Sequence, residues 1–169
     1  ISYGIESGSQ EILDNIEKGF SLAQVERAVK WTREAGIRAK GLFMIGYPEE
    51  TEETLNQTLS LLLRIPLDEI NLSFLTPYPG TEFYYQARRS TDFVEDWSRM
   101  NAMNCLLKPK RLSEDALEKA YAKIIRKFYG RPGITFSYLG LLVGSPENCA
   151  RLAAGLGQWL LNSMRLFPR

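Results

Sequence analysis

The feature that most constrains this fold is a repeated alternation of an apolar strand pattern, a tight turn and a helix pattern. The strand patterns are centred near Tyr3, Phe43 and Leu72, so the repeat recurs about every 35 residues. Such alternation predicts parallel strands that are joined by right-handed crossovers. We therefore expect an α/β fold over residues 1–89.

Turn and capping residues set the expected boundaries. Strands are predicted at the start of the chain, at residues 37–45 and at residues 70–75, and helices are predicted after Ser9, Ser21 and Thr51 and over residues 82–88. Ser21 and Gln24 form a capping-box pattern. The continuous apolar run at residues 42–45 is typical of a parallel strand that is covered on both faces.

The remainder, residues 90–169, is predicted to be a helical extension. Residues 92–107 are expected to be a linking helix, and Ser113 begins an amphipathic helix that is broken at Arg131-Pro132-Gly133. Residues 136–143 form a short apolar stretch, and Ser145-Pro146 is a strong helix start.

Composition excludes several classes of site. The 169 residues contain no histidine, which excludes a Ser/His/Asp triad and a histidine-based zinc site within this chain. Cys105 and Cys149 lie far apart in no metal-binding spacing, so two free thiols are expected. The net charge of +1 does not indicate a nucleic-acid partner. No apolar run approaches the roughly 20 residues that span a bilayer, and we expect a cytoplasmic protein.

Polar and glycine residues follow each predicted strand. Glu6 and Ser7 lie between Gly4 and Gly8 after the first strand, Gly46 follows the second, and residues 75–77 end the third. Ligand contacts in α/β folds lie at the carboxyl ends of the strands. These positions are therefore the candidate site.

The order and spacing of three motifs carry a resemblance to a known family. The motifs are Gly4-Ile5-Glu6-Ser7-Gly8-Ser9, Gly46-Tyr47-Pro48-Glu49-Glu50-Thr51 and Pro77-Tyr78-Pro79-Gly80-Thr81. In this order they resemble the second half of a radical S-adenosylmethionine (SAM) domain. The match covers residues 1 to about 89. It is closest to the branch that carries an N-terminal cobalamin-binding domain, whose tail the segment Lys127-Phe128-Tyr129-Gly130-Arg131-Pro132 also resembles.

The resemblance implies the last three βα units of a partial, TIM-like (β/α)6 barrel. It also implies a [4Fe-4S] cluster, bound by a CxxxCxxC loop, that cleaves SAM reductively to a 5′-deoxyadenosyl radical. This sequence has no CxxxCxxC. We therefore expect the chain to be the back portion of a longer protein and to be catalytically incomplete alone, with no catalytic residue and no metal ligand of its own.

Cofactors and partners follow from the same resemblance. SAM is expected to bind this chain, while the ligands of the cluster, and the domain for cobalamin where it is used, are expected in a missing N-terminal portion. The cluster would need a reductant such as a flavodoxin or a ferredoxin. The substrate is unknown, and methyl transfer and cyclisation are both compatible with the family.

Individual residues take roles from the family pattern. The cofactor contacts that it implies are Glu6 on the SAM ribose with Ser7 as a helper, Lys18 on the SAM carboxylate, Gly46 beside the adenine, and the backbone of Leu75, Thr76 and Pro77 along the adenine edge. Tyr78 could face the substrate. Glu50 and Thr51 are expected to order a turn and to cap a helix. Two departures are Leu42, where the family has a glycine, and Glu49, which replaces a frequent glycine.

Simpler interpretations stand beside these roles. Glu6 could cap the following helix, Lys18 could be a solvated surface lysine, and Tyr78 could pack on the barrel rim. A different function is a non-catalytic accessory module that docks on a partner or on a membrane surface, which the basic C-terminal residues with Trp159 and Phe167 would favour. Another (β/α)-barrel enzyme is a third alternative.

Overall fold

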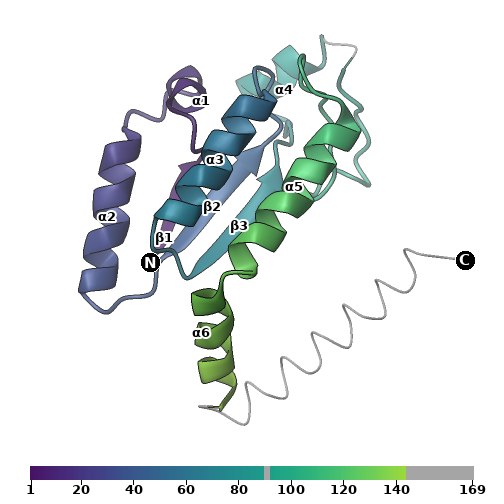
Figure 1. Ribbon diagram of the computed structural model, residues 1–169. Helices are drawn as coiled ribbons and strands as arrows, with labels where there is room; N and C mark the ends of the chain where they lie inside the picture. Colours follow the sequence, from purple (N-terminus) through teal and green to yellow (C-terminus); the bar gives the residue numbers. More distant parts are fainter. Residues whose placement is uncertain (90–91, 144–169) are drawn as a thin grey trace, which may run out of the picture. The chain divides into compact units, whose positions relative to one another are not determined.

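The computed structural model describes residues 1–89 and 92–143. Its centre is a parallel sheet of β1 (Ser2–Glu6), β2 (Lys40–Ile45) and β3 (Glu69–Phe74), in the order β1-β2-β3 (Figure 1). The predicted α/β class with parallel strands is therefore confirmed. Closure into a barrel is not seen among the described residues.

Six helices are described in the chain. They are α1 (Gln10–Asn15), α2 (Leu22–Glu34), α3 (Glu52–Arg64), α4 (Glu82–Ala87), α5 (Glu114–Tyr129) and α6 (Pro132–Val143). The capping box at the start of α2 is present, because the Ser21 side chain accepts from the Gln24 amide and the Gln24 side chain accepts from the Ser21 amide. Thr51 caps α3 in the same way with Thr54. The predicted starts of α2 and α3 are thus confirmed.

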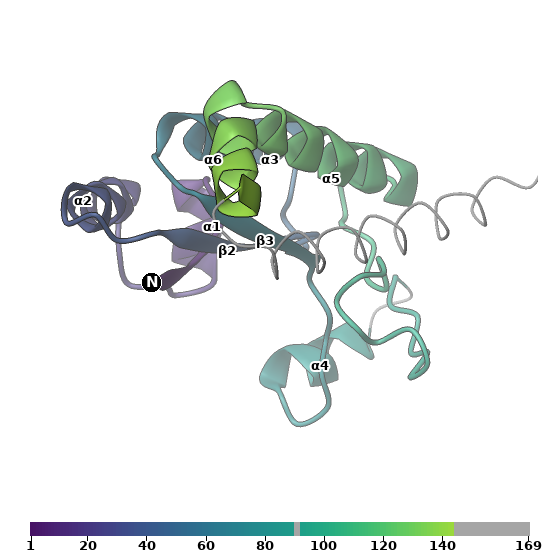
Figure 2. The same cartoon turned by 90° about the horizontal axis from the view of Figure 1, so that it is seen from below.

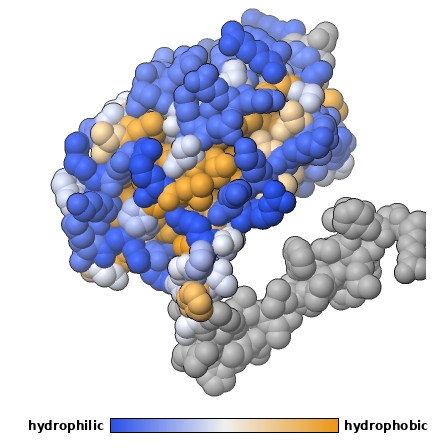
Figure 3. Space-filling view, in the orientation of Figure 1, coloured by the Kyte–Doolittle hydropathy of each residue, from blue (hydrophilic) through white to orange (hydrophobic). Residues whose placement is uncertain are grey.

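One face of the sheet is covered by α3 and α5, and α4 lies towards the other side (Figures 1 and 2). The rings of Phe74 on β3 and Tyr121 on α5 stack with centroids 5.0 Å apart. Ile5, Phe43 and Leu72 are almost fully buried and come from the three strands. Figure 3 shows hydrophobic residues among hydrophilic ones on the surface of this face.

The expectation that β2 is covered on both faces is wrong for this structure. Gly41, Phe43 and Ile45 are buried, whereas Leu42 and Met44 between them are only partly buried. Successive side chains of a strand point to opposite faces, so one face of β2 packs under the helices. The other face contributes Met44 to a cavity.

The predicted helix over residues 92–107 is also wrong. These residues form turns and an isolated antiparallel bridge between Phe93 and Leu107. Their short polar side chains bind nearby backbone amides: Asp96 Oδ1 accepts from the Ser98 N–H at 3.0 Å, and Asn101 Oδ1 accepts from the Met103 N–H at 3.1 Å. Such local bonds compete with a helix.

The break at Arg131-Pro132-Gly133 is confirmed, because α5 ends at Tyr129 and α6 begins at Pro132. The apolar stretch of residues 136–143 belongs to α6. Two compact units divide the chain, Ile1–Phe128 and Tyr129–Arg169. The predicted boundary between residues 89 and 90 concerns the family domain and stays a prediction.

Some expectations fall on residues 144–169. The helix start at Ser145-Pro146, the thiol of Cys149 and the basic surface with Trp159 and Phe167 all lie outside the described residues. Within the described part of the chain, no helix has the length and apolar character that a membrane crossing needs.

Candidate functional site

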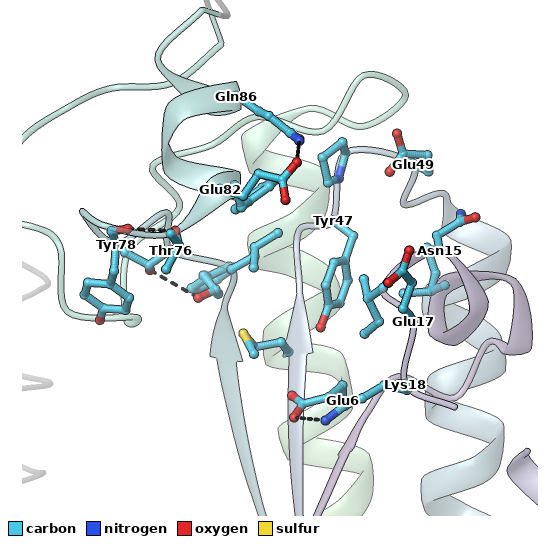
Figure 4. Close-up of a pocket in the computed structure, with 18 of the residues that line it drawn as sticks. Glu6, Asn15, Glu17, Lys18, Tyr47, Glu49, Thr76, Tyr78, Glu82 and Gln86 are labelled. Atoms are coloured by element: carbon cyan, nitrogen blue, oxygen red, sulfur yellow. Dashed lines mark hydrogen bonds and ion pairs between the residues drawn. The ribbon is translucent and has the colours of Figure 1, made fainter. Parts of the chain in front are cut away.

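A cavity of about 980 Å³ lies in the first unit, at the carboxyl ends of the strands (Figure 4). It brings together five of the predicted residues, Glu6, Lys18, Leu75, Thr76 and Tyr78. Polar lining residues that were not predicted are Asn15, Glu17, Tyr47, Glu49, Thr81, Glu82 and Gln86. The volume suits a cofactor with a substrate, since ligand pockets range over about 300–1,000 Å³.

The Glu6 and Lys18 side chains form an ion pair across the floor of this cavity. Lys18 Nζ lies 3.1 Å from Glu6 Oε1, and the side chains are 31% and 17% exposed respectively. Lys18 is thus partly exposed and paired with Glu6, and both its role on the SAM carboxylate and the simpler interpretation as a solvated surface lysine stay predictions. Glu6 has φ +70°, a left-handed conformation that is unfavourable for a residue with a Cβ.

The backbone before Glu6 explains how the pair is positioned. The register of β1 against β2 shifts between Gly4 and Glu6, where Gly4 pairs with Leu42 and Glu6 with Phe43. A bulge of this kind re-aims a side chain at the end of a strand. A Cβ at Gly4 would lie 3.2 Å from Glu6 Oε1 and 3.8 Å from Lys18 Nζ. Gly4 thus leaves room for the carboxylate.

Ser7 is not placed in the cavity lining. Its side chain is buried, accepts from the Ser9 N–H at 3.1 Å and lies 3.4 Å from Thr58 Oγ1. The adjacent Gly8 N–H donates to Thr58 Oγ1 at 2.9 Å. Ser7 and Gly8 therefore dock α3 against the turn after β1, and the role of Ser7 as a cofactor contact stays a prediction.

Gly46 does not line the cavity either, but it shapes the turn whose next residues do. It has φ +95°, and a Cβ there would lie 3.2 Å from Leu117 Cδ2. The buried Glu50 carboxylate accepts from the Gly46 N–H at 2.7 Å, the Tyr47 N–H at 3.4 Å and the Thr54 hydroxyl at 3.1 Å. Burial raises the pKa of Glu50, and these hydrogen bonds oppose that rise. Glu50 orders the turn, as predicted.

Tyr47 projects from this turn into the cavity. The residue is 5% exposed, and its hydroxyl points towards the Glu6–Lys18 pair (Figure 4). Its pKa is raised, first by burial and then by the negative charges of Glu6 and Glu50. The hydroxyl therefore stays protonated at neutral pH. The sequence-based prediction missed Tyr47 and chose its neighbour Gly46, although a tyrosine directly after a strand-end glycine was the available signal.

The segment after β3 forms another wall. The Leu75 N–H donates to the Ile45 carbonyl at 2.8 Å and so continues the ladder, and the Thr76 hydroxyl donates to the Phe74 carbonyl at 3.2 Å. Tyr78 lines the cavity and is 46% exposed. Pro77 lies between two lining residues but is not itself placed in the lining.

The arrangement can bind a polar, partly cationic ligand. Carboxylates of Glu6, Glu17, Glu49 and Glu82 and the ammonium of Lys18 are available at its walls, and carboxylates accept hydrogen bonds from hydroxyl and ammonium groups. The described cysteine, Cys105, is not in the lining, and burial, with the charges of Glu114 and Glu118, raises its pKa to about 11. A thiol of this kind is a poor metal ligand, because metals bind the thiolate.

Comparison with known proteins shows similarity to one enzyme family. Residues 1–62 match the model of the radical SAM superfamily. The chain is 31% identical over 135 residues to an uncharacterized methyltransferase of Pyrococcus horikoshii, covering 79% of this chain and 29% of the relative. It is 33% identical over 129 residues to an anaerobic magnesium-protoporphyrin IX monomethyl ester cyclase of Cereibacter sphaeroides, covering 76% of this chain and 21% of the relative.

A third relative is a bacteriochlorophyllide d C-12(1)-methyltransferase of Chlorobaculum tepidum, 27% identical over 130 residues, which are 76% of this chain and 28% of the relative. The resemblance that the motifs carry is thus confirmed. The chain spans less than a third of the length of each of these three relatives.

Proposed function

We propose that this chain, whose residues 1–62 belong to the radical SAM superfamily, binds SAM in the cavity at its strand ends as part of an enzyme for methyl transfer or cyclisation. The observation that carries the proposal is the convergence of Glu6, Lys18, Leu75, Thr76 and Tyr78 on one cavity. The similarity to methyltransferases and a cyclase supports the two reaction classes. The sheet would then be the last three strands of a partial (β/α)6 barrel.

The residues present fit the nucleoside end of SAM. The Glu6 carboxylate can accept two hydrogen bonds, which matches the two hydroxyls of a ribose. Gly4 provides the space beside that carboxylate, since a Cβ there would crowd it at 3.2 Å. Lys18 supplies a positive charge for the SAM carboxylate, with the geometry of a point charge rather than a fork.

The residues described do not fit the iron–sulfur cluster. No group of cysteine or other metal-binding side chains converges among the described residues, so the cluster would depend on a CxxxCxxC motif outside this chain. When it is bound, the cluster supplies the electron for SAM cleavage. The use of cobalamin, a flavodoxin or ferredoxin reductant and a cytoplasmic location remain parts of the proposal that rest on the motif resemblance.

The test is a titration of the 169-residue chain with SAM, followed by nuclear magnetic resonance (NMR). Saturable shifts are expected at the cavity residues. Glu6→Ala should weaken binding by more than about tenfold, because hydrogen bonds to a charged group contribute about 1.5–3 kcal/mol. Glu6→Gly keeps the left-handed backbone without strain, and it should lose the same affinity.

Glu26→Ala is the matched control. Glu26 pairs with Arg64 at 2.5 Å on the surface and is not in the cavity lining, so its loss should leave SAM affinity unchanged. Absence of saturable shifts in the wild-type chain would contradict SAM binding and favour an accessory module. Unchanged affinity in both Glu6 variants would assign Glu6 a structural role instead.

A further inference from the structure

Tyr47 combines deep burial with a polar group that the fold leaves unused. The residue is 5% exposed, and no hydrogen bond of its hydroxyl is found among the described residues. No buried polar side-chain atom of the described residues lacks a partner, so the Tyr47 hydroxyl oxygen is not a buried atom and opens into the cavity that this residue lines. The ring of Tyr47 is therefore packed in the protein while its hydroxyl opens into the cavity without a protein partner. A polar group presented in this way is available to a ligand.

The backbone at Tyr47 fixes the direction of this hydroxyl. Glu50 Oε2 accepts from the Tyr47 N–H at 3.4 Å and from the Gly46 N–H at 2.7 Å, and the φ of +95° at Gly46 sets the turn. The side chain lies between the Glu6–Lys18 pair on one side and the wall with Glu82 and Gln86 on the other (Figure 4). The hydroxyl is aimed at the pair.

The protonation state of the hydroxyl sets its role. Burial and the nearby charges of Glu6 and Glu50 raise its pKa, so it cannot act as a base at neutral pH. A protonated phenol donates one hydrogen bond, whereas a carboxylate only accepts. Glu6 and Tyr47 are therefore complementary. Glu6 accepts hydrogen bonds from ligand hydroxyls, and Tyr47 donates one to a ligand oxygen that carries no proton.

We infer that the Tyr47 hydroxyl is a second contact to the ribose of a bound adenosyl group. It donates a hydrogen bond to a ribose oxygen, next to the ribose hydroxyls that donate to Glu6. This inference rests on the proposed binding of SAM. It adds a hydrogen-bond donor, Tyr47 in the turn after β2, to the acceptor Glu6 at the end of β1. Glu6 and Tyr47 would thus hold the ribose from two neighbouring strand ends.

The test uses Tyr47→Phe in the 169-residue chain, with SAM as the probe and NMR titration as the readout. Loss of one hydrogen bond should weaken SAM binding about fivefold, since such a bond contributes about 1 kcal/mol. The thermal midpoint should be no lower than that of the wild type, because the change removes a hydroxyl that has no protein partner.

Tyr3→Phe is the matched control. The Tyr3 hydroxyl lies 2.6 Å from Thr32 Oγ1 and is not in the cavity lining. Its loss should lower the thermal midpoint and leave SAM affinity unchanged, the opposite of the result expected for Tyr47→Phe.

The outcomes separate this inference from the proposed function. If Glu6→Ala weakens SAM binding while Tyr47→Phe does not, Tyr47 is not a ribose contact and the proposed function stands. A lower thermal midpoint for Tyr47→Phe would also overturn the inference, because it would reveal a structural bond. If the wild-type chain does not bind SAM, both fall together.

Discussion

At the scale of the residue, Glu50 has the most constrained environment near the site. The residue is 1% exposed, and its carboxylate accepts from two backbone amides and one hydroxyl. Burial raises its pKa above the usual value of 4.5. Glu50 therefore holds Tyr47 in place without touching the cavity, and a change there would act on ligand binding indirectly.

The raised pKa of Glu50 predicts a pH-dependent stability that Glu50→Gln abolishes. The folded carboxyl takes up a proton at a higher pH than the unfolded one, so the wild type gains stability relative to the variant as pH falls from neutral towards about 4.5. The gain is about 1.4 kcal/mol per pKa unit between the two states. Urea unfolding of both proteins at several pH values measures it.

Glu49→Gln is the neighbouring control. Its side chain is 48% exposed and lies 3.5 Å from Lys110, so this variant shows the effect of the same chemical change at the surface. A flat difference between the wild type and Glu50→Gln over this pH range would contradict the raised pKa of Glu50.

At the scale of the element, the docking of α3 depends on the absence of a side chain at Gly8. A Cβ there would lie 2.4 Å from Thr58 Cα and 2.9 Å from the Gln57 carbonyl oxygen. Both are backbone atoms of α3, so a methyl group cannot be accommodated by a rotamer change. The helix and the turn after β1 must move apart if this position is filled.

Gly8→Ala should therefore lower the free energy of unfolding by about 2 kcal/mol or more, as expected for overpacking. Urea denaturation with the same fluorescence signal for each variant measures this change. Gly133→Ala in α6 is the matched substitution, because a Cβ there meets nothing within 4 Å, and it should be neutral or slightly stabilising. Equal effects of the two changes would contradict the close approach of α3.

Elements with strong local signals were predictable from the sequence. The capping residues Ser21 and Thr51 lie at the helix starts because their side chains satisfy exposed amides whatever the tertiary structure is. The segment of residues 92–107 was not, because its helical spacing competes with the local hydrogen bonds of Asp96 and Asn101. The spacing of apolar residues alone does not show whether the helix or the local side-chain hydrogen bonds are more stable.

At the scale of the whole molecule, the chain spans less than a third of the three relatives described and carries two cysteines. Anaerobic reconstitution of the purified chain with ferrous iron and sulfide should therefore give no stoichiometric [4Fe-4S] absorption, because such clusters need several cysteine thiolates from one site. Visible and Mössbauer spectroscopy measure the outcome. Iron retained in a defined cluster after desalting would contradict it.

A Cys105→Ser variant is the control for loosely bound iron. Because the Cys105 thiol is half-buried and its pKa is raised to about 11, the variant and the wild type should retain the same small amount of metal. A loss of metal in the variant would instead assign Cys105 as a ligand.

The candidate site was predictable only where its residues are close together in the sequence. Glu6 and Lys18 could be placed together because both flank one short helix after one strand, which is local information. Tyr47 could not, since the direction of its hydroxyl depends on the Gly46 backbone and on Glu50 of the same turn. Ser7 was assigned to the cavity because neither spacing nor residue type reveals its contact with Thr58, which lies 51 positions away.

Gly4 offers a way to tune this protein without altering any charge in it. A methyl group at this position would press on the Glu6 carboxylate from 3.2 Å, while the parallel pairing of Gly4 with Leu42 would remain. Ligand preference could thus diverge between related chains, or be adjusted in the laboratory, by one small substitution beneath the ion pair. Glu6 and Lys18 would both be retained, and only the positions of their charged groups would change.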